Sequence, residues 1–290
     1  MTIGIIANLA KPEITTVVPQ FLRWLQERDV SAVVERALVE HLELADGTAA
    51  VSSDELVQRA GMIVAFGGDG TILATARLVG RAETPILGVK IGGMGFLAEL
   101  TPDELLTRFA DILEGKYELV ERMVLEARLD GEKQPRRFYA LNDFVLDKGG
   151  LPRVIRIKTY VDDAFLNAYI ADGLIISTPT GSTAYSLAAG GPILLPSMEA
   201  IIINPISPHT LSARPVVIPG DKVVTAEVTS APHDVLLSAD GQVSIALKPG
   251  HRVRMSKADF KVKLVSSAGH SFFDVLHTKL HWGEDVREAS

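Results

Sequence analysis

The stretch that decides the fold is Met62-Ile63-Val64-Ala65-Phe66-Gly67-Gly68-Asp69-Gly70-Thr71. The apolar run Met62–Phe66 predicts a strand buried on both faces, as in a parallel sheet. Glycines follow at once, and a helix is expected over Ile72–Val79. Ligands of open α/β sheets bind at the carboxyl ends of strands, where glycines let a phosphate approach the backbone. The segment therefore predicts an anion-binding loop in an α/β domain.

Asp69 is the informative residue of this loop, because a carboxylate opposes phosphate binding and needs another reason to be there. It could position Mg²⁺, or it could accept a proton from an attacking hydroxyl. The alternative is an ordinary tight turn in which Asp69 is exposed or caps the helix. The residues alone leave these interpretations open.

The first 119 residues alternate strands and helices, which implies a parallel sheet covered by helices. The predicted strands are Ile3–Ala7, Ala32–Glu35, Met62–Phe66 and Pro85–Ile91. The predicted helices are Thr15–Arg28, a short one from the Ser52 cap to Ala60, Ile72–Val79, and one that Thr101-Pro102-x-Glu104 opens and that reaches Leu113. Gly92-Gly93-Met94-Gly95-Phe96 follows the fourth strand, so two glycine-rich turns would share one sheet edge. Glycines also commonly end strands.

After about residue 120 the pattern changes to short strands separated by turn residues. They are Val124–Leu129, Arg137–Leu146, Val154–Val161, Ala164–Ile170, Leu174–Ser177, Ile201–Asn204, Pro215–Ile218, Lys222–Val228, Val235–Ala239 and Val243–Leu247. The single helix expected among them is Thr183–Ala189. We therefore predict an α/β domain over 1–119 and a mostly antiparallel β domain over 120–267. Phe272–Trp282, within the tail 268–290, is amphipathic and could fold back to complete the first domain.

Three segments of the second domain carry candidate polar groups. The hydroxyl-rich turn Thr178–Thr183 opens a helix of small residues, where Tyr185 could lie against a flat base. The alternative is a capped helix that packs closely because its residues are small. Leu141-Asn142-Asp143 lies within a strand-like stretch, so at least one polar side chain faces inward or lies near a strand end. Ser238–Gln242 predicts a type I′ hairpin turn at Asp240-Gly241, whatever its function.

Composition excludes several classes of protein. The 290 residues include no cysteine, which excludes disulfides, cysteine-ligated metals and a thiolate nucleophile. With 29 Lys+Arg against 36 Asp+Glu, the net charge of −7 argues against a nucleic-acid-binding face. No apolar run approaches the roughly 20 residues of a membrane span. Met1-Thr2-Ile3-Gly4 carries no charged region before an apolar one, so we expect no export signal. We expect a cytoplasmic protein without nucleic-acid or membrane partners.

These residues together resemble the NAD kinase family. Gly67–Thr71 is similar to its GGDG signature, which diacylglycerol kinases, sphingoid kinases and 6-phosphofructokinases share more loosely. Asp172–Pro192, with its PTGSTAYSLAAGGP core, resembles the second and far more specific signature. Pro208–Pro215, the Asp240-Gly241-Gln242 turn and the tail Phe273–Trp282 match as well. The resemblance spans nearly the whole chain.

The resemblance implies a Rossmann-like first domain of NAD kinase and diacylglycerol kinase type, followed by a β-sandwich-like domain. It implies ATP and NAD as substrates, with the γ-phosphoryl group passing to the adenosine 2′-hydroxyl of NAD to form NADP. It also implies a divalent metal ion, Mg²⁺, held mainly through substrate phosphates rather than by protein ligands, and a homodimer or homotetramer.

The resemblance also assigns roles to residues. Asp69 would accept the 2′-hydroxyl proton or orient that hydroxyl, as the catalytic residue. The phosphate loop would consist of Gly67, Gly68, Gly70 and Thr71. The residues expected to bind NAD are Asp69, Gly70, Asn142, Asp143, Arg153, Asp172, Thr183, Ala184, Tyr185, Ser186, Leu187, Ala188 and Gln242. The family commonly has Asn-Glu where this chain has Asn142-Asp143, so the shorter Asp143 would lose its contact with a ribose hydroxyl or make it through water.

Two other functions are compatible with parts of the sequence. A lipid kinase of the diacylglycerol kinase type shares the GGDGT loop, but it needs a large apolar pocket and has no clear use for Thr178–Ala188. A non-catalytic NAD-binding regulator would be expected to have lost Asp69 or the glycine loop, and both are intact.

Overall fold

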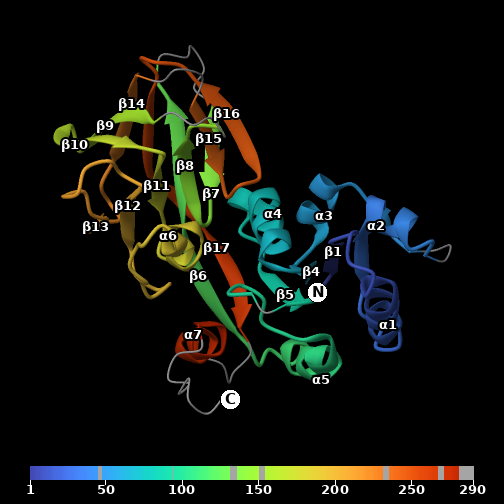
Figure 1. Ribbon diagram of the computed structural model, residues 1–290. Helices are drawn as coiled ribbons and strands as arrows, with labels where there is room; N and C mark the ends of the chain where they lie inside the picture. The colour runs from blue at the N-terminus through green and yellow to red at the C-terminus, as the bar shows by residue number, and fades with distance from the viewer. Residues whose placement is uncertain are drawn as a thin grey trace. The chain divides into compact units, whose positions relative to one another are not determined.

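The computed structural model describes residues 1–44, 48–93, 95–130, 136–149, 154–230, 235–266 and 271–280. The chain divides into two compact units, Met1–Val120 with the chain from Lys263 onward, and Glu121–Val262 (Figure 1). The first boundary lies one residue from the predicted one, and the second lies five residues before it. No helix of the described residues is long and apolar enough to cross a membrane.

Unit 1 is built on a parallel sheet in the order β3-β2-β1-β4-β5. Its strands are β1 (Ile3–Ala7), β2 (Ala32–Glu35), β3 (Ala50–Val51), β4 (Met62–Gly67) and β5 (Ile86–Lys90). In β1, Ile5 pairs with Val34 of β2 and with Val64 of β4. Every residue of β1 and β4 is buried, as expected for strands covered on both faces.

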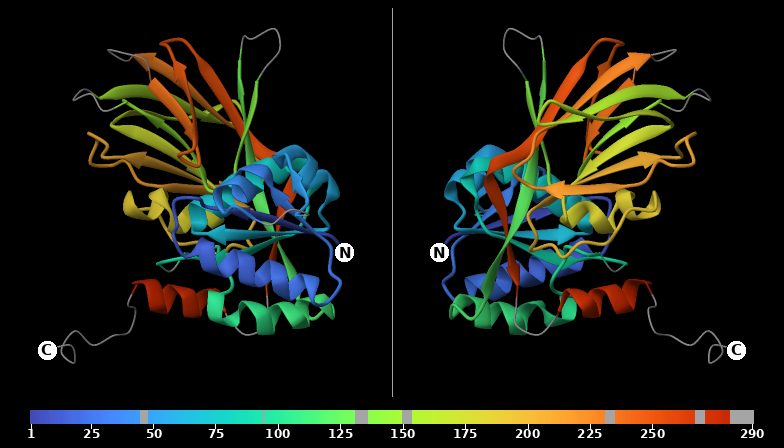
Figure 2. Two further views of the ribbon diagram at one scale, coloured as in Figure 1. Left: turned by 90° about the vertical axis from the view of Figure 1, so that its right-hand side faces the viewer. Right: turned by 90° about the vertical axis from the view of Figure 1, so that its left-hand side faces the viewer.

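Helices cover both faces of this sheet (Figure 2). They are α1 (Ile14–Gln26), α2 (Arg36–His41), α3 (Ser53–Arg59), α4 (Asp69–Val79) with the 3₁₀ turn η1 (Gly80–Ala82), α5 (Pro102–Leu113) and α7 (Phe272–Leu280). On the α1–α5 face, Phe21 meets Phe109 edge-on at 4.8 Å and packs against Phe66 of β4. The capping box predicted at Thr101 and Glu104 is present.

Helix α4 begins three residues earlier than predicted. Gly68 is its extended N-cap, so Asp69, Gly70 and Thr71 form the first helical turn. A carboxylate is favourable there because the first turn of a helix carries partial positive charge. The short elements α2 and β3 were not predicted, because each is too brief for a periodic pattern.

Unit 2 is a sandwich of two antiparallel sheets. One sheet has the order β10 (Ala164–Ala171), β9 (Ile155–Val161), β14 (Val224–Ser230) and β17 (Arg252–Ser266), with β6 (Glu118–Leu129) pairing β17 and β7 (Arg137–Ala140). The other has the order β13 (Val216–Pro219), β12 (Ala200–Ile206), β11 (Gly173–Ser177), β8 (Asp143–Asp147), β15 (Val235–Ala239) and β16 (Val243–Leu247). Buried side chains of both sheets form one apolar core. The predicted fold class is therefore confirmed.

Strand β17 is the longest of the described strands, and the sequence did not predict it. Its buried apolar residues alternate at Val253 and Met255, then shift phase to Ala258, Phe260 and Val262, and this shift obscures the strand pattern. Within unit 2, Met255 of β17 pairs with Val224 of β14. Within unit 1, Leu264 of β17 pairs with Ile86 of β5.

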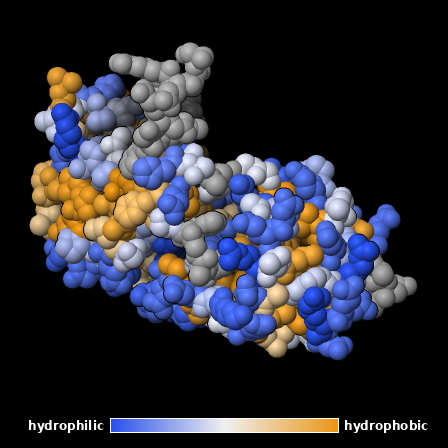
Figure 3. Space-filling model, turned by 90° about the horizontal axis from the view of Figure 1, so that it is seen from below, coloured by the Kyte–Doolittle hydropathy of each residue, from blue (hydrophilic) through white to orange (hydrophobic). Residues whose placement is uncertain are grey.

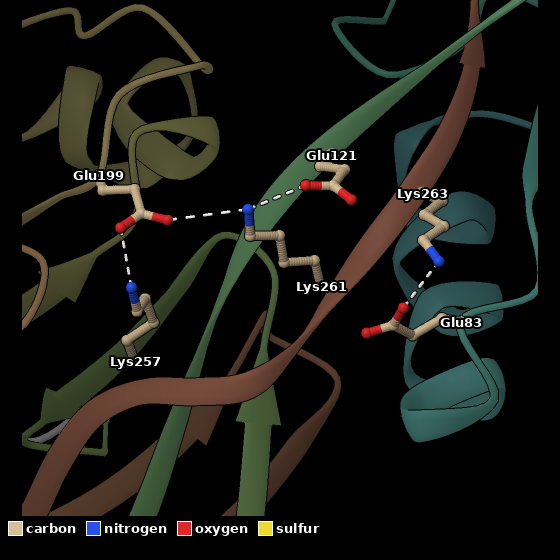
Figure 4. Close-up of polar contacts among 6 residues, drawn as sticks. All are labelled: Glu83, Glu121, Glu199, Lys257, Lys261 and Lys263. Carbon is tan, nitrogen blue, oxygen red and sulfur yellow. Dashed lines mark hydrogen bonds and ion pairs between the residues drawn. The ribbon is translucent and has the colours of Figure 1, made fainter.

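The half-buried lysines of β17 are paired with glutamates (Figure 4). Within unit 2, Lys261 lies 2.9 Å from Glu121 and 3.8 Å from Glu199, which Lys257 also contacts at 2.8 Å. Within unit 1, Lys263 contacts Glu83 at 2.8 Å. These partly exposed pairs contribute little each, on the order of 0–1 kcal/mol.

Two further predictions were wrong in detail. The stretch Arg137–Leu146 is two strands, because the chain turns a corner at Leu141-Asn142 between β7 and β8. The helix predicted over Thr183–Ala189 is shorter, a 3₁₀ turn η2 (Thr180–Thr183) followed by α6 (Tyr185–Ala188). Helix α7 ends at Leu280, and Trp282 lies outside the described residues.

Candidate functional site

The sheet of unit 1 has a switch point between β1 and β4. From β1 the chain continues to β2 on one side, whereas β4 is followed by β5 on the other side. Ligands of open α/β sheets bind outside the carboxyl ends of the strands at such a point. The segments beyond these ends begin at Asn8 and at Gly68.

The glycines of the first loop serve two different purposes. A Cβ on Gly67 would lie 2.1 Å from Oγ1 of Thr71, so packing within the protein requires glycine there. A Cβ on Gly68 or on Gly70 would meet nothing within 4 Å. The space over these two residues is open, and a phosphate could approach their backbone N–H groups at the start of α4.

Asp69 joins the two glycine-rich loops. Its carboxylate accepts hydrogen bonds from the backbone N–H groups of Phe96 at 2.8 Å and Leu97 at 3.0 Å. Gly95 lies so close that a Cβ there would be 2.0 Å from Oδ1 of Asp69. The ammonium of Lys279 in α7 lies 4.6 Å from the centroid of the Phe96 ring. Asp69 is thus neither a free turn residue nor the helix cap, and its side chain is held in one orientation.

Unit 2 contains a cavity of about 290 Å³. Its described lining residues are Asn142, Asp143, Val145, Asp147, Ala184, Tyr185, Ser238, Asp240 and Gly241. The corner before β8, the segment leading into α6 and the β15–β16 turn therefore meet there. Tyr185 is 48% exposed, which leaves its ring available to a ligand.

The corner at Leu141–Asp143 is held by the carboxylate of Asp240. Its oxygens accept three successive backbone N–H groups, those of Leu141 at 2.9 Å, Asn142 at 2.8 Å and Asp143 at 3.1 Å. Asp240 and Gly241 both have positive φ, 51° and 64°, as a type I′ turn requires. The predicted turn is therefore present, and it also positions two candidate NAD-binding residues.

The segment leading into α6 holds the same corner from another side. The hydroxyl of Thr178 donates to the carbonyl of Leu141 at 2.6 Å, and its N–H donates to the carbonyl of Asn142 at 2.9 Å. Gly181 lies against that carbonyl, since a Cβ on it would be 2.2 Å away. Glycine and small hydroxyl residues are needed here because the two backbones approach closely.

Asp143 carries a carboxyl group that is only 4% exposed. Burial, with a further contribution from the negative charge of Asp240, raises the pKa of Asp143 to about 7. Near neutral pH a large part of this group is therefore protonated, and it can donate a hydrogen bond as well as accept one.

Other predicted site residues do not line this cavity. Asp172 pairs with Lys148 at 2.6 Å. Ser186 is fully buried and accepts hydrogen bonds from the amide of Asn204. Thr183, Leu187, Ala188 and Gln242 are also not among the described lining residues, and Gln242 is exposed. Arg153 lies outside the described residues, as does Met94.

Two residues of interest were missed by reasoning from the sequence. Asp240 was predicted only to form a turn. A carboxylate at such a turn can also accept hydrogen bonds from N–H groups of a neighbouring segment. Lys11 was not singled out, although it follows the first strand of a predicted parallel sheet and therefore lies at the carboxyl edge where ligands bind.

No group of three or more His, Asp or Glu side chains that could hold a metal is found within the described residues. Together these features define a nucleotide-binding protein of the α/β class.

Comparison with known proteins identifies the family. The model of the ATP-NAD kinase N-terminal domain matches residues 3–117, and that of the ATP-NAD kinase C-terminal domain matches residues 141–267. The NAD kinase of Geotalea daltonii is 42% identical over 97% of this chain and 99% of its own. That of Serratia proteamaculans is 40% identical over 98% and 97%. The chain belongs to the ATP-NAD kinase family, whose enzymes phosphorylate NAD with ATP.

Solved structures agree in fold. Yeast NADH kinase complexed with NADH superimposes with a TM-score of 0.90 at 26% identity, over 100% of this chain and 90% of that one. An NAD kinase from Archaeoglobus fulgidus in complex with ATP has a TM-score of 0.76 at 22% identity, over 97% and 99%, and shares the fold. Because the chain matches the ATP-NAD kinase family, the alternative of a lipid kinase of the diacylglycerol kinase type is discarded.

Proposed function

We propose that this chain transfers the γ-phosphoryl group of ATP to the adenosine 2′-hydroxyl of NAD, with Asp69 as the catalytic residue. The observation that carries the proposal is the carboxylate of Asp69, which two backbone N–H groups orient next to Gly68 and Gly70, where a Cβ would meet no atom within 4 Å. A carboxylate has about four lone-pair positions. Two hydrogen bonds therefore leave Asp69 able to accept a hydroxyl proton.

In unit 1, the proposed donor site is the start of α4. The N–H groups of its first turn would bind phosphate oxygens, together with the hydroxyl of Thr71. Positioning and charge neutralisation are the main requirements of phosphoryl transfer, which needs no covalent nucleophile. The absence of cysteine from the chain is compatible with this chemistry.

In unit 2, the proposed NAD contacts are in the cavity that Asn142, Asp143 and Tyr185 line. Asn142 and Asp143 would bind ribose hydroxyls, and Tyr185 would lie against a flat ring. The protonated form of Asp143 can donate to a hydroxyl oxygen, which compensates in part for its side chain being one methylene shorter than Glu. We retain Arg153, Asp172, Thr183, Ala184, Ser186, Leu187, Ala188 and Gln242 as proposed NAD contacts on the resemblance alone.

The proposed metal is Mg²⁺, bound mainly by the phosphates of the substrates. When bound, it neutralises phosphate charge. We also propose a cytoplasmic location.

We propose that the chain assembles as a homodimer or homotetramer. Large apolar side chains of unit 2 remain exposed, including Phe165 at 60% and Leu211 at 94%. Apolar atoms also gather on part of the face shown in Figure 3. Light scattering coupled to size-exclusion chromatography would give twice or four times the chain mass, and a mass of one chain would contradict the proposal.

The proposed function is tested with the purified protein, ATP, Mg²⁺ and NAD, by measuring NADP. Asp69→Asn is expected to lower kcat about 100-fold or more, as for loss of a general base. Circular dichroism should stay close to wild type, and thermal unfolding reports whether losing one acceptor oxygen toward Phe96 or Leu97 loosens the loop. If the folded variant kept wild-type turnover, Asp69 would not be the base. If the wild-type chain bound NAD but made no NADP, the regulator would be the better description.

A further inference from the structure

Lys11 lies beside the second glycine-rich loop, although it comes from a different part of the chain. It follows β1, and its side chain is half-buried. Its Nζ atom is 3.1 Å from the position that a Cβ on Gly92 would occupy. Gly92 has φ +93°, a conformation that favours glycine, so this space stays open to the lysine.

The ammonium of Lys11 has no ion pair or side-chain hydrogen bond with any residue in the described part of the chain. Three lysines that are engaged, by contrast, are Lys116, Lys148 and Lys261, which lie 2.6, 2.6 and 2.9 Å from carboxylate oxygens. A half-buried ammonium has lost part of its hydration and gains from an anionic partner. Lys11 therefore has an unmet capacity to bind an anion.

Contacts link three loops at this edge of the sheet in unit 1, and Lys11 belongs to the first of them. The β1 loop approaches the first glycine loop, where a Cβ on Gly67 would be 3.2 Å from Cβ of Asn8. The first glycine loop is tied to the second through Asp69 and the N–H group of Phe96. The second loop contains Gly92, beside which Lys11 lies. The same sheet edge thus holds the open backbone of Gly68 and an unpaired cation.

The charges of this edge show why a cation is needed. The glycine loops supply only backbone dipoles, and Asp69 adds a negative charge that opposes a phosphate chain. We propose that Lys11 binds the phosphate chain of ATP through its ammonium group. This inference depends on the proposed function, because it names a further contact of the same donor site.

The test compares Lys11→Met with Lys11→Arg and with two matched variants, Lys116→Met and Lys90→Met. Lys116 is an exposed, carboxylate-paired lysine of the same unit. Lys90, the last residue of β5, also lies at the carboxyl edge, but among the described residues no contact is found that places its ammonium beside a glycine loop. Lys90→Met therefore separates a specific contact from the general positive charge of the edge.

Lys11→Met is expected to raise the KM for ATP roughly 10- to 100-fold, the usual effect of losing a hydrogen bond to a charged group. The KM for NAD should change less than about twofold, Lys11→Arg should recover part of the loss, and Lys116→Met should match wild type. An unchanged KM for ATP in Lys11→Met would overturn the inference. So would an equal rise for ATP and NAD with lowered thermal stability, or an equal effect of Lys90→Met.

Calorimetric titration with inorganic tripolyphosphate separates this inference from the proposed function. Tripolyphosphate presents the phosphate chain without the nucleoside, and its binding does not require NADP formation. Weaker binding by Lys11→Met than by wild type would support the inference even if the chain made no NADP. Equal binding by both proteins would overturn it even if the chain were an active NAD kinase.

Discussion

Asp143 places an ionisable group where charge is unfavourable. Its carboxyl titrates near 3.8 in an unfolded chain and, because of burial and the charge of Asp240, its pKa is raised to about 7 in the folded protein. Between these pH values the folded state binds more protons than the unfolded state. The free energy of unfolding therefore falls as the pH rises from about 4 to 7.

The first prediction concerns this pH dependence. Asp143→Asn removes the titrating group and with it this loss of stability. The free energy of unfolding of the variant minus that of wild type should therefore be roughly 3 kcal/mol larger at pH 8 than at pH 5, at about 1.4 kcal/mol per pH unit. Urea unfolding of both proteins at the two pH values measures this difference. Identical pH profiles would show that Asp143 titrates normally.

The glycines of the first loop give a second prediction at the residue scale. Gly67→Ala would clash with Thr71, so we expect it to lower stability by about 1–3 kcal/mol. Gly68→Ala has open space, so its melting temperature should stay near that of wild type while the KM for ATP rises. Thermal unfolding and steady-state kinetics check both variants. Unchanged ATP kinetics in Gly68→Ala would remove Gly68 from the phosphate loop.

At the scale of elements, the turn between β15 and β16 controls the corner between β7 and β8. Asp240 supplies two carboxylate oxygens to three N–H groups that no strand ladder satisfies. An asparagine tolerates the positive φ of this position but has only one acceptor oxygen. The turn and the corner are thus coupled through a single side chain.

Asp240→Asn should therefore cost about 1–3 kcal/mol of stability, because a buried N–H group loses its acceptor. It should also raise the KM for NAD more than that for ATP, and lower the pKa of Asp143 by removing the nearby charge. Asp163→Asn is the matched control, since Asp163 is an exposed turn residue with φ 67°. If the two variants behaved alike in stability and kinetics, Asp240 would only form a turn.

At the scale of the whole molecule, the net charge of −7 sets a constraint on function. Both proposed substrates are anions, so their binding cannot rely on a general positive field. Local groups must supply the attraction, namely the N–H groups of the glycine loops, Lys11 and a metal ion bound to the phosphates.

Removal of the metal should therefore weaken ATP binding strongly. With excess EDTA, we expect the Kd for ATP to rise at least about tenfold, because the phosphate charge is no longer neutralised. Calorimetry in Mg²⁺ and in EDTA at equal ionic strength measures the change, and NAD binding to the same protein serves as the internal control. Equal ATP affinity in both buffers would contradict the proposed role of Mg²⁺.

Local features of the fold could be predicted from the sequence because their causes are local. Thr101, Pro102 and Glu104 predict a helix start from chemistry within four residues, and the capping box is found. The apolar run Met62–Phe66 predicts a buried strand, and the structure extends it only to Gly67. The glycines of the phosphate loop were likewise identified from their place after a strand.

Features that depend on distant residues could not be predicted in this way. Strand β17 escaped detection because its apolar pattern changes phase near Ser256, so no single alternation runs along it. The corner at Asn142 looked like the middle of a strand because its acceptor, Asp240, lies 98 residues away. The raised pKa of Asp143 depends on burial by several strands of the sandwich.

The sequence by itself determined the class of each domain, the family, and the residues that carry the glycine loop and the proposed base, because these depend on short patterns and local backbone chemistry. Only the tertiary structure decided which groups meet. It brought Asp69 to Phe96, Asp240 to the N–H groups of Leu141–Asp143, and Lys11 to Gly92. The reason is physical, since hydrogen bonds, burial and ion contacts act through distances in space that chain order does not specify.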